Sequence, residues 1–480
     1  MSTAVEAPQV GEIEQRGIDL VPPEERHGQP RDLFFMWFGT NTNVFYIING
    51  AIVISIGLNF LQSVLVILLG NLAFFLMGLT SLQGPRTGTA TFAINRAPFG
   101  IHGGRVVAFF NWLTVLGFEG SGVALAVIAL LTLVQTWGWS IAGDAWFKVL
   151  IVVLVAGAQL LTPLFGHATI MVVQKILAWM FAIFFVTLAI LMSGKMNLGA
   201  GHPGNLADFT LGFALMVSAG GLSWANTGSD YSRYLPRDSS PGAIFWWASW
   251  GGFIPAVLLE ILGAAVATHF PGASDPISGL PSALPGWFVS IYLVILTVNL
   301  LAVNGIDLYS SGLTLQTMGL RIKRIFTTSI DMVIAGVLAG IAVFSSNFNT
   351  LYGQFLGLLI LFLAPWVAIY LVDAWYRRDR YDAVGLLRAA GGPYWYDGGV
   401  NWRGIVSLAI GMVASALWLN SPLLQGPLSH LFGGSDMSVF TGILGAGIAY
   451  LLLARDVVPF QESTGASIEP GATPDPVGSA

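Results

Sequence analysis

Two short polar stretches decide how this chain can fold: GTNTN at residues 39–43 and SAGGLSWANTG at residues 218–228. Each interrupts an apolar segment that is otherwise long enough to span a membrane as a helix. Helices broken at corresponding places of two halves are typical of transporters built from an inverted repeat. The two stretches lie five apolar segments apart, so they predict a repeat of five helices plus five. For the Gly and Ser positions, close packing between helices is the competing interpretation.

Composition points to the same class of protein. Of the 480 residues, 55% are hydrophobic and only 9% are charged, whereas soluble domains carry about 25% charged residues. The mean hydropathy is +0.74. Such a chain cannot cover a water-facing surface, so we expect an all-α polytopic membrane protein.

Twelve apolar segments of suitable length follow one another, with Gly- and Pro-containing breaks between them. We expect twelve transmembrane helices, at about residues 33–58, 60–82, 105–134, 145–165, 168–193, 208–228, 241–268, 286–317, 325–345, 351–375, 402–420 and 436–454. The predicted domains are a cytoplasmic N-terminal tail (1–32), a transporter domain (33–454) and a disordered cytoplasmic C-terminal tail (455–480).

The Lys and Arg residues set the expected orientation. With the N-terminus placed in the cytoplasm, 17 of the 20 basic residues fall in inner tails and loops, Lys148 and Lys195 fall outside, and Lys175 lies within the fifth span. Both termini are therefore predicted to be cytoplasmic, in a multi-pass protein of the cell membrane in contact with lipid. The polar first 30 residues do not resemble a signal peptide. A net charge of −5 gives no reason to expect a nucleic-acid partner.

Catalytic patterns are missing from the sequence. The chain has no cysteine, its six histidines lie in the tail or near span ends and loops, and no GxxxxGK[ST] phosphate loop is present. We therefore expect neither an enzyme nor a metal centre nor a cofactor. A membrane-embedded enzyme and a sensor without transport are the less favoured classes. Transport would then be passive or driven by an ion gradient.

Carboxyl groups within the predicted spans are the candidates for coupling transport to an ion. Glu119 lies in the third span among small and apolar residues, where an ionised carboxylate costs at least a few kcal/mol. Glu119 either takes part in proton coupling or forms a structural hydrogen bond, and for Glu260 in the seventh span the structural role is favoured. Nearer the inner surface, we expect Asp331 to cap the ninth span, and Asp230 to be either solvated or paired with Arg233.

The segment SWANTGSDYSRYLP at residues 223–236 resembles the end of the sixth helix in nucleobase–cation symporter family one. Its pattern WxxxxxDYxxYxP is similar to that of the purine–cytosine permease branch. Three further stretches agree with this family: WFGTN (37–41), GPRTG (84–88) and LYSSGL with LQ (308–313 and 315–316). The resemblance extends over about residues 30–455.

The resemblance implies a LeuT-like fold, in which the first ten helices form the inverted repeat and two more follow. It also implies nucleobase uptake by cation symport through alternating access, usually with protons in this branch. In the family, an aromatic residue of helix 3 and a Trp of helix 6 hold the base between them, and Phe118 and Trp224 match those positions. Asn304 and Asp307 match the part of helix 8 that binds the edge of the base.

Together these observations give a candidate site. The expected substrate-binding residues are Thr40, Asn41, Phe118, Ser223, Trp224, Asn304 and Asp307. The expected coupling residues are Glu119 and Thr297. Sodium-dependent members of the family have several small hydroxyl residues in helix 8, whereas Thr297 is a single hydroxyl, so protons are favoured over sodium.

Three departures from the family pattern concern the substrate. Phe118 replaces a frequent Trp, Gly122 replaces a frequent amide side chain, and Ile306-Asp307 replaces a frequent Pro-Asn. An ionised Asp307 only accepts hydrogen bonds, which favours ligands with N–H donors such as cytosine and adenine. Allantoin, hydantoins and vitamin precursors also have such donors. The alternative function is therefore symport of one of these, or of an amino acid, on the same fold and with either protons or sodium.

Overall fold

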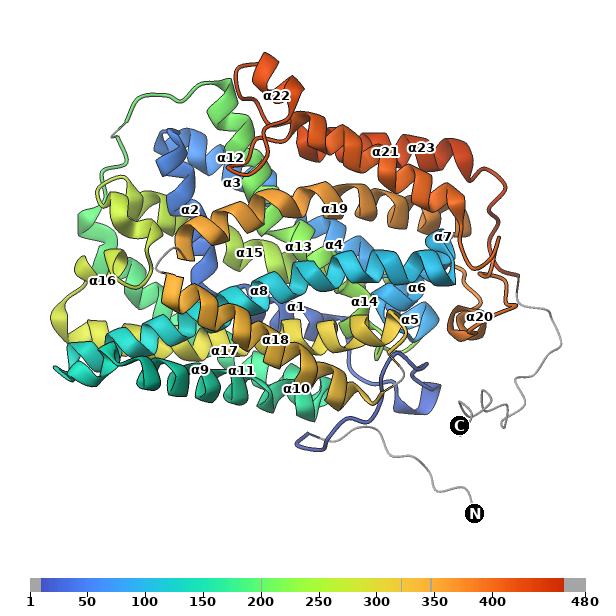
Figure 1. The fold of residues 1–480 in the computed structure, drawn as a ribbon, viewed down its shortest axis with the longest axis horizontal. Helices are drawn as coiled ribbons and strands as arrows, with labels where there is room; N and C mark the ends of the chain where they lie inside the picture. Colours follow the sequence, from blue (N-terminus) through green and yellow to red (C-terminus); the bar gives the residue numbers. More distant parts are fainter. Residues whose placement is uncertain (1–9, 200, 321, 346–347, 462–480) are drawn as a thin grey trace.

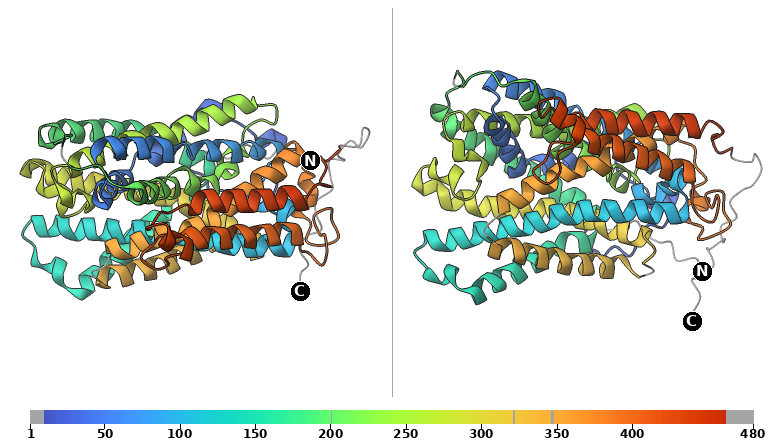
Figure 2. Two further views of the ribbon diagram at one scale, coloured as in Figure 1. Left: turned by 90° about the horizontal axis from the view of Figure 1, so that it is seen from above. Right: turned by 45° about the horizontal axis from the view of Figure 1, so that its top comes forward.

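The computed structural model describes residues 10–461 except 200, 321 and 346–347, and within them the regular structure is helical. Long helices run side by side along one direction (Figures 1 and 2). The longer helices and the pieces of broken ones are α1 (Pro30–Asn41), α2 (Val44–Ile56), α3 (Phe60–Asn71), α4 (Phe74–Thr80), α8 (Ile101–Thr136), α9 (Ala145–Gln159), α10 (Leu161–Phe165), α11 (His167–Met192), α12 (Leu206–Ala219), α13 (Gly221–Ala225), α14 (Gly228–Ser232), α15 (Pro241–Ala267), α17 (Gly286–Thr317), α18 (Arg324–Ser345), α19 (Phe348–Arg377), α21 (Trp402–Trp418) and α23 (Ser438–Leu453).

Nine helical stretches in the described residues are long and apolar enough to cross a membrane. Three shorter apolar helices accompany them: Val44–Ile56, Trp402–Trp418 and Ser438–Leu453. Each of the twelve predicted segments coincides with one helix or with a pair or trio of helix pieces. The expected all-helical polytopic class is confirmed, while the count of twelve crossings stays a prediction.

The break predicted in the first span lies between α1 and α2. Here Thr42 and Asn43 are not helical, and the side chain of Asn43 accepts a hydrogen bond from the Phe45 N–H (3.0 Å). Asn299 of α17 completes the break: its amide donates to the Thr42 carbonyl (2.8 Å), and its oxygen accepts from the Val44 N–H (3.2 Å). The polar stretch is therefore present because backbone groups freed by the break need partners inside an apolar bundle.

The break predicted in the sixth span divides that segment into α12, α13 and α14. Gly220 separates α12 from α13, and Asn226 and Thr227 separate α13 from α14. At Gly221 a Cβ atom would lie 1.9 Å from the Phe74 backbone nitrogen. Glycine is thus required because α13 approaches the backbone of α4 without room for any side chain.

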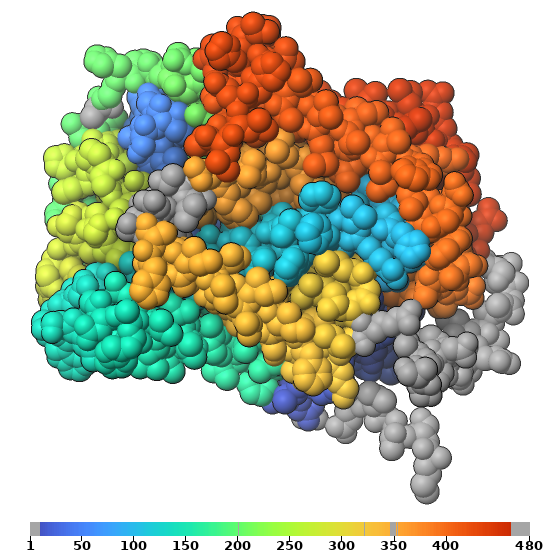
Figure 3. Space-filling model, in the orientation of Figure 1, coloured from blue at the N-terminus to red at the C-terminus, as the bar shows by residue number. Residues whose placement is uncertain are grey.

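The long helices pack around the two broken segments. The helix α8 packs along α17 and α18, while α1 and α2 pack against α15. The last two apolar helices, α21 and α23, pack against each other and against α19. In the space-filling view these C-terminal helices, in orange-red, form a block along one edge (Figure 3). Both broken segments are therefore inside the bundle, where side chains near the breaks can share a cavity.

Candidate functional site

A cavity lies where the two broken segments meet α8, α17 and α19. Its lining residues are Asn43, Phe45, Tyr46, Val115, Phe118, Ala219, Ser223, Trp224, Asn226, Val303, Asn304, Asp307 and Tyr352. The cavity thus takes aromatic rings, amides and one carboxyl group from five parts of the chain. An arrangement of mostly apolar walls with a few converging polar groups is typical of small-molecule sites.

The two aromatic residues expected to hold a flat ligand both line this cavity, and neighbouring rings support them. Trp224 donates from its indole nitrogen to the hydroxyl of Tyr46 (3.2 Å), and Tyr46 in turn donates to Asn41. Trp37 packs edge-on against Trp224, with ring centroids 5.5 Å apart. Phe118 packs edge-on against Phe355 of α19 at 4.9 Å. Both rings are therefore held before any ligand binds, which lowers the entropy lost on binding.

Two polar side chains of α17, Asn304 and Asp307, line one edge of the cavity. The amide nitrogen of Asn304 donates to the Glu119 carbonyl (2.9 Å) and to Gln159 (3.2 Å). A Cβ atom at Gly122 would lie 2.2 Å from the Asn304 amide oxygen. Gly122 therefore leaves the space that the Asn304 amide group occupies.

Asp307 contributes a carboxyl group to the same edge. It is 7% exposed, and no donor in the described part of the chain reaches its oxygens. The carboxyl therefore faces the cavity as an acceptor without a protein partner. A ligand that offers N–H groups there would satisfy it.

The structure brings together five of the seven predicted substrate-binding residues: Phe118, Ser223, Trp224, Asn304 and Asp307. Thr40 and Asn41 are buried beside the cavity and do not line it. Thr40 donates to the Met36 carbonyl (2.9 Å), and Asn41 donates to the Trp37 carbonyl (2.8 Å) and reaches the cavity only through Tyr46.

Sequence reasoning missed several lining residues. Asn43 and Asn226 stand inside the two polar stretches, so the stretches themselves were a usable signal. For Tyr46, Val303 and Tyr352 the local sequence carries no such signal, because an isolated Tyr or Val in an apolar helix is normal for a membrane protein.

The two expected coupling residues occupy different places. Glu119 is fully buried in α8, directly after Phe118 of the cavity wall. Thr297 is also buried, but its hydroxyl donates to the Leu293 carbonyl one turn earlier in α17 (2.9 Å), and it does not line the cavity. Within the described ranges, no group of three His, Asp or Glu side chains is arranged to hold a metal ion.

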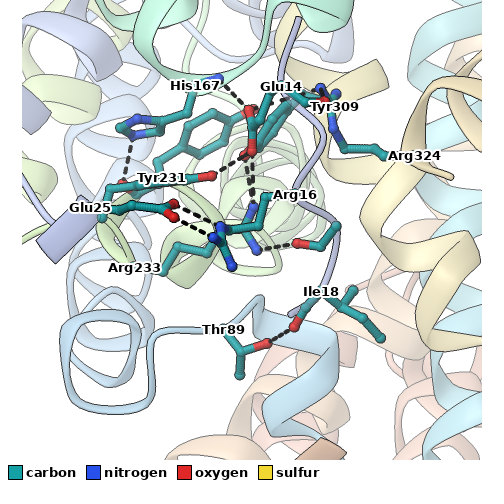
Figure 4. A network of polar contacts seen from close by, with 12 residues as sticks. Glu14, Arg16, Ile18, Glu25, Thr89, His167, Tyr231, Arg233, Tyr309 and Arg324 are labelled. Carbon is teal, nitrogen blue, oxygen red and sulfur yellow. Dashed lines mark hydrogen bonds and ion pairs between the residues drawn. The ribbon is translucent and has the colours of Figure 1, made fainter. Parts of the chain in front are cut away.

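A second polar cluster surrounds Glu14, in the segment before α1 (Figure 4). Its carboxylate accepts from the His167 N–H (2.7 Å) and from the hydroxyls of Tyr234 (2.5 Å) and Tyr309 (3.1 Å). The guanidinium groups of Arg233 and Arg324 lie 3.6 and 3.9 Å from it. Burial alone would raise the pKa of Glu14, but the two arginines and the hydrogen bonds hold it below its usual value.

This cluster fastens the N-terminal segment across one end of the bundle. Arg233 also donates to the Gly17 carbonyl (2.7 Å), and the Thr89 hydroxyl donates to the Ile18 carbonyl (2.5 Å). The segment, which sequence analysis describes only as a polar tail, therefore packs on the helices in residues 10–29. The expected pairing of Asp230 with Arg233 is not formed, since Asp230 accepts from the Thr91 N–H (2.8 Å) while Arg233 turns to Glu14.

Comparisons with known proteins agree with this geometry. Residues 20–445 match a family described as permeases for cytosine/purines, uracil, thiamine and allantoin. A Bacillus subtilis protein, YxlA, whose name assigns it to the purine-cytosine permeases, is 32% identical over 456 residues, covering 92% of this chain and 96% of the relative. The purine-cytosine permease FCY21 of Saccharomyces cerevisiae is 26% identical over 471 residues, covering 91% of this chain and 85% of the relative.

Solved structures show the same fold at low identity. Mhp1, a nucleobase-cation-symport-1 family transporter in a closed conformation with bromovinylhydantoin bound, superimposes with a TM-score of 0.74 at 20% identity, covering 92% of this chain and 95% of that one. A Na⁺-coupled sialic acid symporter gives a TM-score of 0.60 at 11% identity, covering 94% of this chain and 93% of that one. The predicted LeuT-like fold is confirmed.

Proposed function

This chain belongs to the family of permeases for cytosine/purines, uracil, thiamine and allantoin, and from that premise we propose that it imports a nucleobase of the cytosine or purine type together with a cation. It is a multi-pass membrane transporter and not an enzyme. The substrate and the coupling ion are the parts of this function that we propose.

One observation carries the choice of substrate: the same cavity joins two supported aromatic rings, Phe118 and Trp224, to an acceptor edge at Asp307. Stacking of a base on an aromatic side chain contributes about 1–3 kcal/mol. A carboxylate and an amide along one edge suit a ligand that offers an exocyclic amino group and a ring N–H. Cytosine and adenine combine a flat ring with those donors.

The second candidate is another small ring-shaped compound with N–H donors, such as allantoin, a hydantoin or a vitamin precursor. The hydantoin bound to Mhp1 supports it, because that protein shares this fold. Allantoin and saturated rings are less flat than a base and would gain less from two aromatic walls. An amino acid is disfavoured further, since a carboxylate ligand would meet the Asp307 carboxyl group.

For the coupling ion we propose protons in preference to sodium. A hard cation needs several oxygen ligands. At the first break, the Thr42 carbonyl already accepts from the Asn299 amide, and Thr297 donates its hydroxyl within its own helix. A buried carboxyl group at Glu119 offers a place for a proton instead.

The contacts of the two chain ends support the placement of both termini on the same side of the membrane. Arg26 donates to Pro85, Arg86 donates to the Arg378 carbonyl (3.5 Å), and Phe460 donates to the Arg380 carbonyl (3.2 Å), so the N-terminal and C-terminal segments meet the same end of the bundle. With the excess of basic residues in the loops at this end, we assign it to the cytoplasm.

Uptake into proteoliposomes tests this proposal. Labelled cytosine, adenine, hypoxanthine and allantoin are each offered under a pH gradient alone and under a sodium gradient alone. Accumulation of cytosine or adenine driven by pH is the expected result. Accumulation driven only by sodium would contradict the choice of ion, and accumulation of allantoin without any base would replace the substrate by the second candidate.

A further inference from the structure

Behind the cavity, two carboxyl groups from different helices face each other. Glu119 of α8 and Asp331 of α18 lie within hydrogen-bonding reach, and both are fully buried. By geometry neither oxygen of Glu119 accepts a hydrogen bond from a described donor, because the nearby Ser311 hydroxyl gives its one proton to Asp331. A buried carboxyl group without a donor is exceptional, because an unsatisfied ionised oxygen in an apolar interior is very costly.

Unlike Glu119, Asp331 accepts hydrogen bonds from two side chains. The indole nitrogen of Trp112 donates to one of its oxygens (2.7 Å), and the Ser311 hydroxyl donates to the other. Asp331 is the eighth residue of α18 and does not cap that helix, contrary to our expectation. Its two donors come from α8 and α17, so three helices hold this carboxyl group as an acceptor.

The described helices packed around the pair supply no cation to it. Arg324 donates to the Pro163 carbonyl (2.6 Å), Lys148 lies over the Phe344 ring, and Arg377 pairs with Asp373 (2.8 Å). Arg105 stands near the start of α8, about 21 Å along the helix axis from Glu119. The other titratable group that faces the pair is Asp307, which is a third carboxyl group and not a cation. Two facing carboxylates without a cation cannot both stay ionised in an apolar interior.

We propose that Glu119 and Asp331 share one exchangeable proton, carried by Glu119 and hydrogen-bonded to Asp331, and that this pair is the proton site of the transporter. The proposal rests on the proposed function and names the site of its coupling ion. Glu119 is the carrier because it has no donor of its own, and as a carboxylic acid it can donate to Asp331. Asp331 is the acceptor because Trp112 and Ser311 already stabilise its negative charge.

The pair is connected to the substrate cavity through two helices. On α8, Phe118 of the cavity wall directly precedes Glu119, whose carbonyl accepts from Asn304. On α17, Asp307 of the cavity edge lies one turn from Ser311, which bonds Asp331. A ligand N–H group would donate a hydrogen bond to the Asp307 carboxyl group. Loss of the proton from Glu119 would leave two carboxylates, one on α8 and one on α18, that face and repel each other. Substrate binding and the proton therefore act on the same helix contacts, as symport requires.

The test compares Glu119→Gln with a matched control, Glu260→Gln. Glu260 is also a fully buried glutamate of a membrane helix, but there Asn71 donates to its carboxyl group. In proteoliposomes we expect Glu119→Gln to exchange labelled cytosine or adenine across the membrane, yet to lose accumulation under a pH gradient by at least tenfold. The control is expected to keep pH-driven accumulation.

A second readout measures the proton directly. At a pH high enough for the ligand-free pair to have released its proton, a pH dye in weakly buffered detergent solution should report about one proton taken up per base bound by the wild type, and none by Glu119→Gln. Trp112→Phe removes one donor from Asp331 and leaves both carboxyl groups in place. It should move the midpoint of proton uptake to higher pH, because the anion of the pair becomes less stable.

The outcomes separate this inference from the proposed function. Wild-type protein that neither binds nor exchanges a base would overturn the function itself. Base transport that stays pH-driven in Glu119→Gln, or base binding that takes up no proton in the wild type, would overturn the proton site while the function stands. If Glu119→Gln fails to fold, an unchanged proton-uptake midpoint in Trp112→Phe would overturn the site in the same way.

Discussion

The Arg233 guanidinium lies 3.6 Å from the Glu14 carboxylate, and both side chains are almost completely buried. Glu14 belongs to the segment before α1, while Arg233 directly follows α14, the last piece of the broken sixth segment. Arg324 at the start of α18 also lies beside Glu14, so the two arginines fasten the N-terminal segment to the ends of α14 and α18. A motion that moves α14 away from α18 at this end would separate these groups.

Removing the charge of Glu14 is expected to weaken this fastening. Glu14→Gln leaves two buried arginines without their anion, and breaking a buried ion pair from one side costs on the order of 3–5 kcal/mol. We expect a lower Tm in detergent. A matched substitution in the same segment, Glu24→Gln, changes an exposed carboxyl group and should leave Tm unchanged.

The absence of cysteine allows the opening itself to be measured. In a Thr89→Cys background the new thiol is the single one in the chain, and Thr89 is fully buried beneath Ile18. Adding Glu14→Gln should speed labelling of that thiol by a water-soluble maleimide. Equal labelling rates with and without Glu14→Gln would mean that the segment does not open through this cluster.

The low pKa of Glu14 gives the same cluster a pH dependence of known sign. A carboxyl group whose pKa is lower in the folded state stabilises the fold above its ordinary value of 4.5, and this stabilisation is lost as the pH falls below it. Tm of the wild type should therefore fall on acidification below about pH 4.5. Glu14→Gln should show a smaller fall over that interval. An identical acid profile in both proteins would show that other carboxyl groups set the acid limit.

The stacking role of Trp224 predicts a loss of affinity for the base. Trp224→Ala should weaken base binding by about 1–3 kcal/mol, which is roughly 5- to 150-fold in Kd. Trp224→Phe keeps a ring but loses the indole donor to Tyr46, so it should be intermediate. Binding measured by calorimetry tests this, with Trp246→Ala, which changes an exposed ring on α15, as the control. Wild-type affinity in Trp224→Ala would exclude stacking.

The carboxyl group of Asp307 is expected to select the ligand edge. Asp307→Asn replaces an acceptor-only group by one that also donates. The preference for adenine, which has an exocyclic amino group, over hypoxanthine, which has a carbonyl there, should shrink by tenfold or more. Tm should not fall, because no described donor depends on this carboxyl group. An unchanged ratio of the two Kd values would place Asp307 outside the recognition of the base.

The sequence predicted those features that depend on local chemistry. Polar residues 40–43 predicted a helix break, because polar side chains within a span are costly unless they face a cavity or one another, and α1 does end at Asn41. Phe118 and Trp224 were predicted from the resemblance to a known family, which implies that aromatic residues of the third and sixth helices hold the base between them. The polar stretches and the family resemblance together predicted five of the residues that line the cavity.

The remaining features depend on contacts between distant segments. Glu14 stands in a polar stretch, where a solvated carboxylate is the normal expectation, and its burial requires Arg233 and Arg324 from far along the chain. Tyr46 and Tyr352 join the cavity only because of the angles at which α2 and α19 approach it. The same holds for Asp331, whose donors lie on two other helices. Such placements are tertiary properties, so local pattern could not supply them.

The contact between Gly122 and Asn304 predicts a non-additive pair of substitutions. In Gly122→Ala the new Cβ would lie 2.2 Å from the Asn304 amide oxygen, so the amide must move and give up its bonds to the Glu119 carbonyl and Gln159. Base affinity should fall at least tenfold. Asn304→Ala removes the amide and should cost a similar amount. In the double variant the added methyl group enters the vacated space, so its loss should equal that of Asn304→Ala alone. Gly104→Ala, on the same helix with ordinary contacts of 3.5 Å or more, should bind as the wild type does. If the two losses instead add in the double variant, Gly122 affects binding by a route other than the position of Asn304.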